Sequence, residues 1–343
     1  MLTLLLVVAL LGSALPAEAQ GLDVDTCLGC HADTNLAVSL PSGETRSLYV
    51  NIDAFRASVH GNKLSCTDCH QDITEVPHAS RPFASLREFT VAYYEQCKRC
   101  HFANYTKTLD SVHYQSLARG DKMAPLCVDC HGSHEVKPAH APEARLSLTC
   151  ARCHEGVSAI YEKSVHGRSA ASNTDVPACT DCHRSHDISG PRTANWQRHI
   201  PELCSNCHSN KALMDKYGLS ANVSQTYVAD FHGMTASLQK NSGNAETSVV
   251  ALCTDCHGVH DITKVDEPGS RVLQANLVKT CARCHEGASD NFPAAWMSHY
   301  EPTWEKAPMV YGVQKFYDVL IPFMMIGLVL QILLHFWRVV VNR

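Results

Sequence analysis

The chain has 343 residues, of which 18 are cysteine and 21 are histidine. Its 29 basic residues are fewer than its 34 acidic ones, which gives a formal charge of −5, and they form no basic run. This balance argues against a nucleic-acid-binding protein.

The first 20 residues, MLTLLLVVALLGSALPAEAQ, are an apolar run followed by Ala17-Glu18-Ala19. The pattern predicts a signal peptide over residues 1–19, and therefore export from the cytoplasm. An uncleaved anchor helix is the alternative, but the run Leu2–Leu15 is shorter than the ~20 residues that cross a bilayer.

Three segments have a local structural signal. Leu36–Val50 alternates apolar and polar residues around Pro41-Ser42-Gly43, which predicts a β-hairpin. The sequences LREFTVAYYEQCKRCH, at 86–101, and EGVSAIYEKSV, at 155–165, both predict helices.

All 18 cysteines fall in nine C-x-x-C-H runs. Two thiols on one side of a short turn can each form a thioether with a haem vinyl group, and the histidine that follows then reaches the iron as its proximal ligand. A disulfide scaffold or a zinc ribbon would not need a histidine after every cysteine pair. The sequence therefore predicts nine covalently bound haems. The thioether cysteines are Cys27, Cys30, Cys66, Cys69, Cys97, Cys100, Cys127, Cys130, Cys150, Cys153, Cys179, Cys182, Cys204, Cys207, Cys253, Cys256, Cys281 and Cys284, and the proximal histidines are His31, His70, His101, His131, His154, His183, His208, His257 and His285.

The runs alternate in type, which indicates an internal repeat. An arginine precedes the second cysteine in three of them (R-type runs, at Cys97, Cys150 and Cys281), and an aspartate in four (D-type runs, at Cys66, Cys127, Cys179 and Cys253). Between the two types lies a second marker, S-V-H or a relative of it, and a trailing histidine follows most D-type runs. The predicted boundaries are 20–96, 97–149, 150–203 and 204–280 for four di-haem units, 281–310 for a half unit and 311–343 for a C-terminal anchor.

Nine other histidines match nine irons as candidate distal ligands. The S-V-H type supplies His60, His113, His166, His232 and His299, the trailing type supplies His134, His186 and His260, and His78 substitutes in the irregular first unit. His140 competes with His134 for one of these positions. A helix from His154 to His166 would be about 18 Å long, so we expect His166 to serve a different haem. We expect the same of His134, which lies about one turn from His131, on the same side of that haem. The predicted fold is mainly α with little regular structure, an elongated repeat with haems as much of its core.

The segment Val319–Trp337 contains no acidic or basic side chain. At 1.5 Å per residue it spans about 28 Å, enough to cross a bilayer. A buried core helix is the alternative. His335 lies near the end of this segment, four residues after Gln331, and is a candidate contact to a haem or quinone of a partner subunit. The alternative is an interfacial histidine whose ring reaches the lipid headgroups.

These repeated SVHG and CTDCHGxH sequences resemble the multihaem c-type cytochromes of anaerobic respiration, especially a group with one C-terminal membrane helix that partners a quinol-oxidising cytochrome b. The resemblance implies haem c attached outside the cytoplasm, with the haem domain on the periplasmic side of the inner membrane. It further implies a non-catalytic subunit that relays electrons between the quinone pool and periplasmic redox proteins. The alternatives are a terminal reductase of nitrite, hydroxylamine or a sulfur oxyanion with one open haem, and direct quinol oxidation by this chain alone.

Overall fold

The computed structural model of the chain describes residues 22–138, 144–170, 172–191, 193–242, 250–295, 299 and 301–342. The predicted signal peptide and His140 lie outside these residues. The chain folds as two compact bodies, which we describe separately. The N-terminal body consists of the residues up to Cys153 together with Ala178–Ser189. The C-terminal body consists of His154–Pro177 together with the residues from Gly190 onward.

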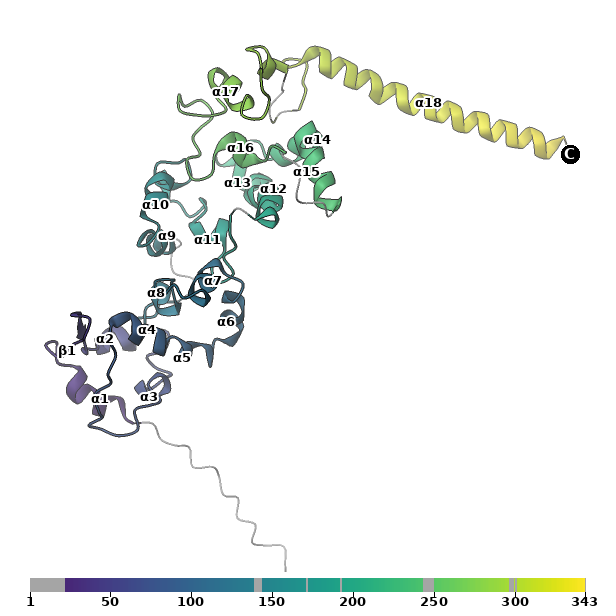
Figure 1. Cartoon of the computed structure of the whole chain (residues 1–343). Coiled ribbons are helices and arrows are strands. Elements are labelled where there is room, and N and C mark those ends of the chain that lie inside the picture. Colours follow the sequence, from purple (N-terminus) through teal and green to yellow (C-terminus); the bar gives the residue numbers. More distant parts are fainter. Residues whose placement is uncertain are drawn as a thin grey trace, which may run out of the picture. The chain divides into compact units, whose positions relative to one another are not determined.

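The N-terminal body consists of short helices joined by turns (Figure 1). Its helices are α1 (Val24–His31), α2 (Ile52–Arg56), α3 (Cys66–Cys69), α4 (Leu86–Tyr93), α5 (Glu95–Lys98), α6 (Phe102–Thr108), α7 (Val112–Ala118), α8 (Cys127–His131), α9 (Ala144–Ala151) and α11 (Cys179–His183).

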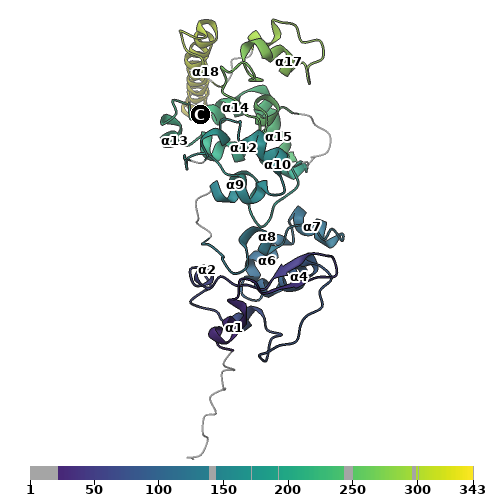
Figure 2. The same cartoon turned by 90° about the vertical axis from the view of Figure 1, so that its left-hand side faces the viewer.

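The C-terminal body is also helical, and Figure 2 shows its helices α12 to α15 together. Its α-helices are α10 (Glu155–Tyr161), α12 (Ala194–His208), α13 (Lys211–Asp215), α14 (Val223–Ala229), α15 (Phe231–Ser242), α16 (Cys253–His257), α17 (Leu277–Cys281) and α18 (Pro308–Val341). Short 3₁₀ turns occur at Gly167–Ser169, Gln274–Asn276 and Phe292–Ala295. Helix α12 packs against α13, α14 and α16.

The predicted hairpin is confirmed as β1 (Ala37–Ser39) and β2 (Thr45–Ser47), which pair antiparallel with Val38 opposite Arg46. Gly43 has a positive φ, a conformation that glycine adopts without steric cost. The hairpin is the only sheet in the described part of the chain, so the prediction of a mainly α protein with little strand is confirmed.

The two predicted helices are present but differ in their ends. The segment 86–101 forms α4 and α5 with a break at Tyr94, and Ser85 caps its start by accepting a hydrogen bond from Glu88 N at 3.1 Å. The second helix, α10, ends at Tyr161 rather than continuing to residue 165. The chain turns there because Ser164 N bonds to Tyr161 O at 2.9 Å and the Ser164 hydroxyl accepts from Gly167 N at 3.0 Å.

Few apolar side chains are fully buried in the two bodies. Among the described residues, the buried apolar ones are Leu40, Ala124, Leu126, Ala178, Ile200, Met214, Tyr227 and Leu277. This is a small core for two bodies of this size, as expected if large cofactors contribute much of the apolar interior.

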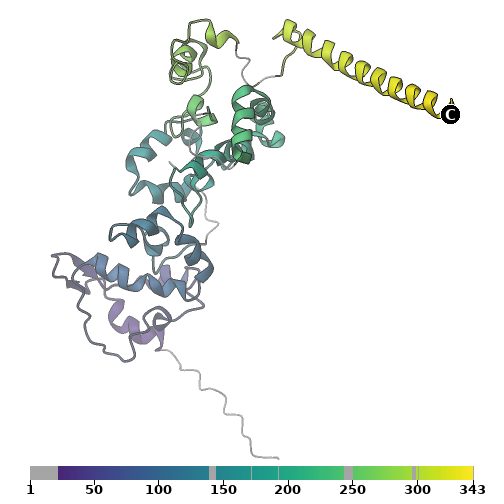
Figure 3. The ribbon, with the colours of Figure 1, turned by 45° about the vertical axis from the view of Figure 1, so that its right-hand side comes forward.

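Helix α18 is the long C-terminal helix, seen clearly in Figure 3. It has 34 residues, a mean hydropathy of 2.3 in its most apolar part, and no buried residue in that part. At 1.5 Å per residue it is about 51 Å long. Its length and composition are sufficient to cross a membrane, as the segment Val319–Trp337 predicted.

Candidate haem centres

Most of the C-x-x-C-H runs lie on or at the end of a helical turn. Helices α8, α11 and α16 are each a complete run of five residues, and α3 covers the four residues before His70. Residues three apart lie on one face of a helix, so the two thiols of a run point to the same side. None of the 18 cysteines forms a disulfide, and no cluster of three or more metal-binding side chains occurs among the described residues.

The aspartate of each D-type run caps the helix on which the run lies. Its Oδ2 accepts from the backbone N–H of the residue immediately before the first cysteine, over 2.6 Å for Asp68, 2.7 Å for Asp129, 2.6 Å for Asp181 and 2.8 Å for Asp255. A negative charge here also favours the helix N-terminus electrostatically. The aspartate therefore holds the run in its helical form.

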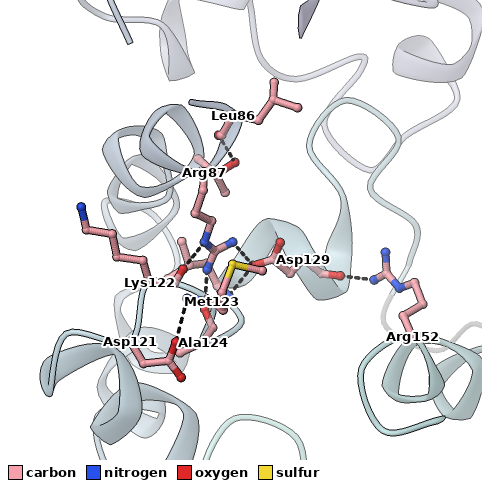
Figure 4. Close-up of polar contacts among 10 residues, drawn as sticks. Leu86, Arg87, Asp121, Lys122, Met123, Ala124, Asp129 and Arg152 are labelled. Atoms are coloured by element: carbon pink, nitrogen blue, oxygen red, sulfur yellow. Dashed lines mark hydrogen bonds and ion pairs between the residues drawn. The ribbon is translucent and has the colours of Figure 1, made fainter. Parts of the chain in front are cut away.

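The arginine of each R-type run ties that run to the preceding D-type run. Arg99 Nη1 donates to Asp68 O at 3.2 Å, and Arg283 Nη1 donates to Asp255 O at 2.7 Å. Arg152 Nη2 donates to Asp129 O in the same way (Figure 4). The alternation of R-type and D-type runs thus has a structural cause, because each pair brings the first run of one unit against the second run of the unit before it.

A further cluster, which the sequence did not reveal, surrounds Asp129 (Figure 4). The guanidinium of Arg87, on α4, donates to the Asp129 carboxylate at 2.8 Å and to the backbone carbonyls of Lys122 and Ala124. Together with Arg152, it joins elements from three predicted units around one D-type run.

Seven proximal histidines each face a distal candidate. Each di-haem unit has a first and a second C-x-x-C-H run, the half unit has only a first, and we name a proximal histidine by the run that it ends. The imidazole rings of S-V-H histidines lie opposite first-run histidines: His60 with His101 at 6.0 Å between ring centroids, His166 with His208 at 6.3 Å, and His232 with His285 at 6.2 Å. Second-run histidines pair with distal candidates from the following unit: His70 with His134 at 6.4 Å, His131 with His186 at 6.0 Å, and His257 with His299 at 6.1 Å. In the irregular first unit His31 pairs with His78 at 6.1 Å.

Three of these pairs address questions that the sequence left open. His134 faces His70, which favours it over His140. His78 occupies the position opposite His31, in place of a regular trailing histidine. His299 was grouped with the S-V-H type, but its ring faces the second-run histidine His257, as trailing histidines do. The ligand roles of all eighteen histidines stay predictions, and the seven ring pairs are the geometry that supports them.

The geometry of the pairs fits a haem iron between two imidazoles. Two metal–nitrogen bonds of ~2 Å, as in other imidazole complexes, and about 1.1 Å from each nitrogen to its ring centre place the two centroids about 6.2 Å apart. All seven pairs lie between 6.0 and 6.4 Å, whereas Phe89 and Tyr93, in direct contact, are 4.6 Å apart.

The electrostatics of the paired rings also suit metal binding. Burial lowers the pKa of His70 to about 4, with the neighbouring His134 as a smaller cause. Burial is likewise the largest cause of the lowered pKa of His134, His166 and His257. These imidazoles are therefore neutral near pH 7, and the neutral form is the one that binds a metal.

The first cysteines of the two runs in each unit lie against each other. Their thiols are close enough for one to shift the pKa of the other in the pairs Cys27–Cys66, Cys97–Cys127, Cys150–Cys179 and Cys204–Cys253. Two haems attached to these thiols would be bound at adjacent points of the chain, so their edges would be close.

The region that matches a known family is central. Residues 119–209 match the family model for cytochrome c3, and this segment contains the runs that begin at Cys127, Cys150, Cys179 and Cys204. The match supports a multihaem c-type cytochrome that transfers electrons. Comparison with curated proteins found no match, and neither did comparison with solved structures.

On α18, Gln331 and His335 lie one helical turn apart on the same face. They line a shallow recess together with Leu328, Ile332, Phe336 and Val339. Two polar side chains are therefore adjacent within an otherwise apolar and exposed helix.

Proposed function

We propose that the chain is a nonahaem cytochrome, anchored to the inner membrane by α18, that relays electrons between the quinone pool and periplasmic redox proteins. The observation that carries the proposal is the set of seven histidine pairs at 6.0–6.4 Å, each made of one C-x-x-C-H histidine and one histidine from a different segment.

Two imidazoles on one iron leave no position for a substrate. Haem supplies reversible one-electron chemistry when it is bound, and the paired histidines would hold it six-coordinate and low-spin in both oxidation states. Such a centre passes electrons and does not bind small molecules. A terminal reductase would need an open iron. In the irregular first unit, the ring of His78 opposite His31 would supply a second imidazole.

Within each body, the spacing of the haem sites supports electron transfer between neighbouring haems. Within a unit, the adjacent first cysteines bring two attachment points together. Between units, Arg99 and Arg283 hold a first run against the preceding second run. Electron tunnelling falls steeply with distance, so attachment points in contact favour transfer from haem to haem.

The membrane part of the proposal rests on α18. The helix is long enough to cross a bilayer, and Arg338 and Arg343 at its end fit a cytoplasmic C-terminus by the positive-inside rule. A single helix makes a poor quinone site alone, which favours an integral cytochrome b as partner. Gln331 and His335 would then face that partner and hydrogen-bond to its haem or quinone.

The test uses protein matured with its haem-attachment machinery. Pyridine haemochrome absorbance per mole of chain should give nine haems, and electron paramagnetic resonance of the oxidised protein should show low-spin iron. In membranes that contain the partner, quinol should reduce the haems. A strong high-spin signal that nitrite or hydroxylamine perturbs would overturn the proposal in favour of a reductase.

A further inference from the structure

Three of the predicted distal ligands lie in the same type of turn, which the S-V-H marker only partly described. The sequences are FRASVHG at 55–61, YEKSVHG at 161–167 and YVADFHG at 227–233. Each begins with an aromatic residue at or near the end of a helix and ends with the distal histidine and a glycine. We refer to them as the His-Gly turns.

The glycine of each turn packs directly against the backbone of the residue six positions earlier. A Cβ at Gly61 would lie 2.1 Å from Phe55 O, and a Cβ at Gly167 or Gly233 would lie 1.9 Å from the carbonyl oxygen of Tyr161 or Tyr227. Contacts of a Cβ below 3.0 Å do not occur in proteins. The three turns therefore require glycine for close approach of two backbone segments.

A side-chain oxygen caps the same glycine. Gly61 N donates to Ser58 Oγ at 3.1 Å, and Gly167 N donates to Ser164 Oγ at 3.0 Å. In the third turn the capping residue is Asp230, whose Oδ1 accepts from Gly233 N at 2.9 Å. Serine and aspartate are interchangeable here because each offers one oxygen to the backbone N–H.

The aromatic residue of two turns is also hydrogen-bonded to a more distant part of the chain. Tyr227 Oη donates to Ala251 O at 2.9 Å, and Tyr161 Oη donates to Pro177 O. These contacts fix the backbone at the start of each turn.

The three histidines share one orientation toward their partners. The planes of the paired rings cross at 56° for His60, 53° for His166 and 53° for His232. Four other distal candidates form pairs that are closer to parallel: 5° for His78, 39° for His134, 28° for His186 and 22° for His299. Histidines in His-Gly turns thus have ring angles of 53–56° to their partners, and the four histidines outside such turns have angles of 5–39°.

We infer that the His-Gly turns orient their histidines so that the haems they serve have tilted axial imidazoles, and that the haems fall into two spectroscopic classes. The inference rests on the proposed bis-histidine ligation. Parallel imidazole planes split the two iron d-orbitals that interact with them, and the splitting falls as the planes turn toward perpendicular. A tilted pair therefore gives a more anisotropic low-spin ferric signal than a parallel pair.

Gly167→Ala tests the turn. Its Cβ must move about 1 Å or more away from the last carbonyl of α10, whereas metal–ligand distances tolerate ~0.2 Å. We expect electron paramagnetic resonance of the oxidised holoprotein to lose one haem per chain from the more anisotropic class and to gain one high-spin haem. Added imidazole should return that haem to low spin, since the iron lacks only its ligand.

Gly156→Ala, in the same helix-and-turn segment, is the matched control, because a Cβ there meets nothing within 4 Å. It should leave both classes unchanged. Ser164→Ala removes the cap without adding bulk, and should shift the same anisotropic signal even if Gly167→Ala fails to accumulate. Low-spin wild-type protein with a single uniform class would overturn the inference while leaving the proposed function intact. An unchanged spectrum in Gly167→Ala or Ser164→Ala would also overturn it, whereas largely high-spin wild-type protein would refute the proposed function.

Discussion

Replacement of Arg87 by alanine should destabilise the N-terminal body more than the loss of an exposed arginine ion pair in that body. The guanidinium reaches three acceptors, namely the carboxylate of Asp129 and the backbone carbonyls of Lys122 and Ala124 (Figure 4). The Arg87 side chain is 19% exposed and that of Asp129 is 37% exposed, so the cluster is only partly screened by solvent.

The loss in the free energy of unfolding depends on the three acceptors that lose their hydrogen-bond donor. Hydrogen bonds to a charged group contribute ~1.5–3 kcal/mol each, and a buried acceptor without a donor costs ~1–3 kcal/mol. Asp129 keeps the N–H of Leu126 as a donor, and partial exposure reduces the ionic contribution. We therefore expect a loss of about 3 kcal/mol in the free energy of unfolding, or a fall in Tm of about 6–12 °C for a body of this size.

Arg56→Ala is the matched control. Arg56 pairs with Asp25 over 3.8 Å, and the two side chains are 58% and 78% exposed, so its loss should cost no more than ~0.5 kcal/mol. Arg87→Lys should fall between the two, because lysine keeps the charge but lacks the planar fork. Urea unfolding followed by far-ultraviolet circular dichroism, on proteins of equal haem content, measures all three. If the free energies of unfolding of Arg87→Ala and Arg56→Ala agree within experimental error, the reasoning about this cluster is wrong.

Three further predictions concern single residues. Arg184 has φ 64° and ψ −171°, a backbone conformation that glycine adopts at the equivalent positions Gly132 and Gly258. Arg184→Gly should therefore raise the free energy of unfolding by about 1 kcal/mol. Arg184→Ala should not raise it. His78→Ala should convert one haem per chain to a high-spin, carbon monoxide-binding form, detected by difference absorbance, and an unchanged spectrum would remove His78 from the ligand set. His335→Leu should slow quinol-dependent reduction of the c haems in membranes about tenfold, the equivalent of one lost hydrogen bond of ~1.4 kcal/mol, and wild-type rates at equal haem content would limit His335 to an anchoring role.

Local features of the sequence predicted local structure well. The hairpin around Gly43 follows from strict alternation and a turn glycine, both of which act over a few residues. Helix α18 follows from a long uncharged apolar segment. The end of α10 was predicted four residues too late, because the apolar pattern does not show that the Ser164 hydroxyl caps the next turn.

The partners of the distal histidines could not be predicted from the sequence. The distances along the chain showed that His134 and His166 should not bind the iron of their neighbouring run, but not which iron they serve. That choice depends on long-range backbone contacts: Val59 N bonds to Val136 O at 3.0 Å, and Val165 N bonds to Ile262 O at 2.8 Å. Each contact joins the residue before an S-V-H histidine to the residue two after a trailing histidine, and no local pattern encodes it.

These contacts also change how the predicted unit boundaries should be understood. His60, in the first unit, faces His101 of the second, and His134, in the second unit, faces His70 of the first. Histidine rings of neighbouring predicted units therefore face each other in both directions, and a cut at residue 96 would separate His101 and His70 from the rings that face them. The sequence repeat marks where similar segments recur. A single repeat, however, does not contain both histidines of each of its ring pairs. If these histidines bind haem as we propose, the contacts that fold the chain would also hold the haems in place, which is the property that a chain of electron carriers requires.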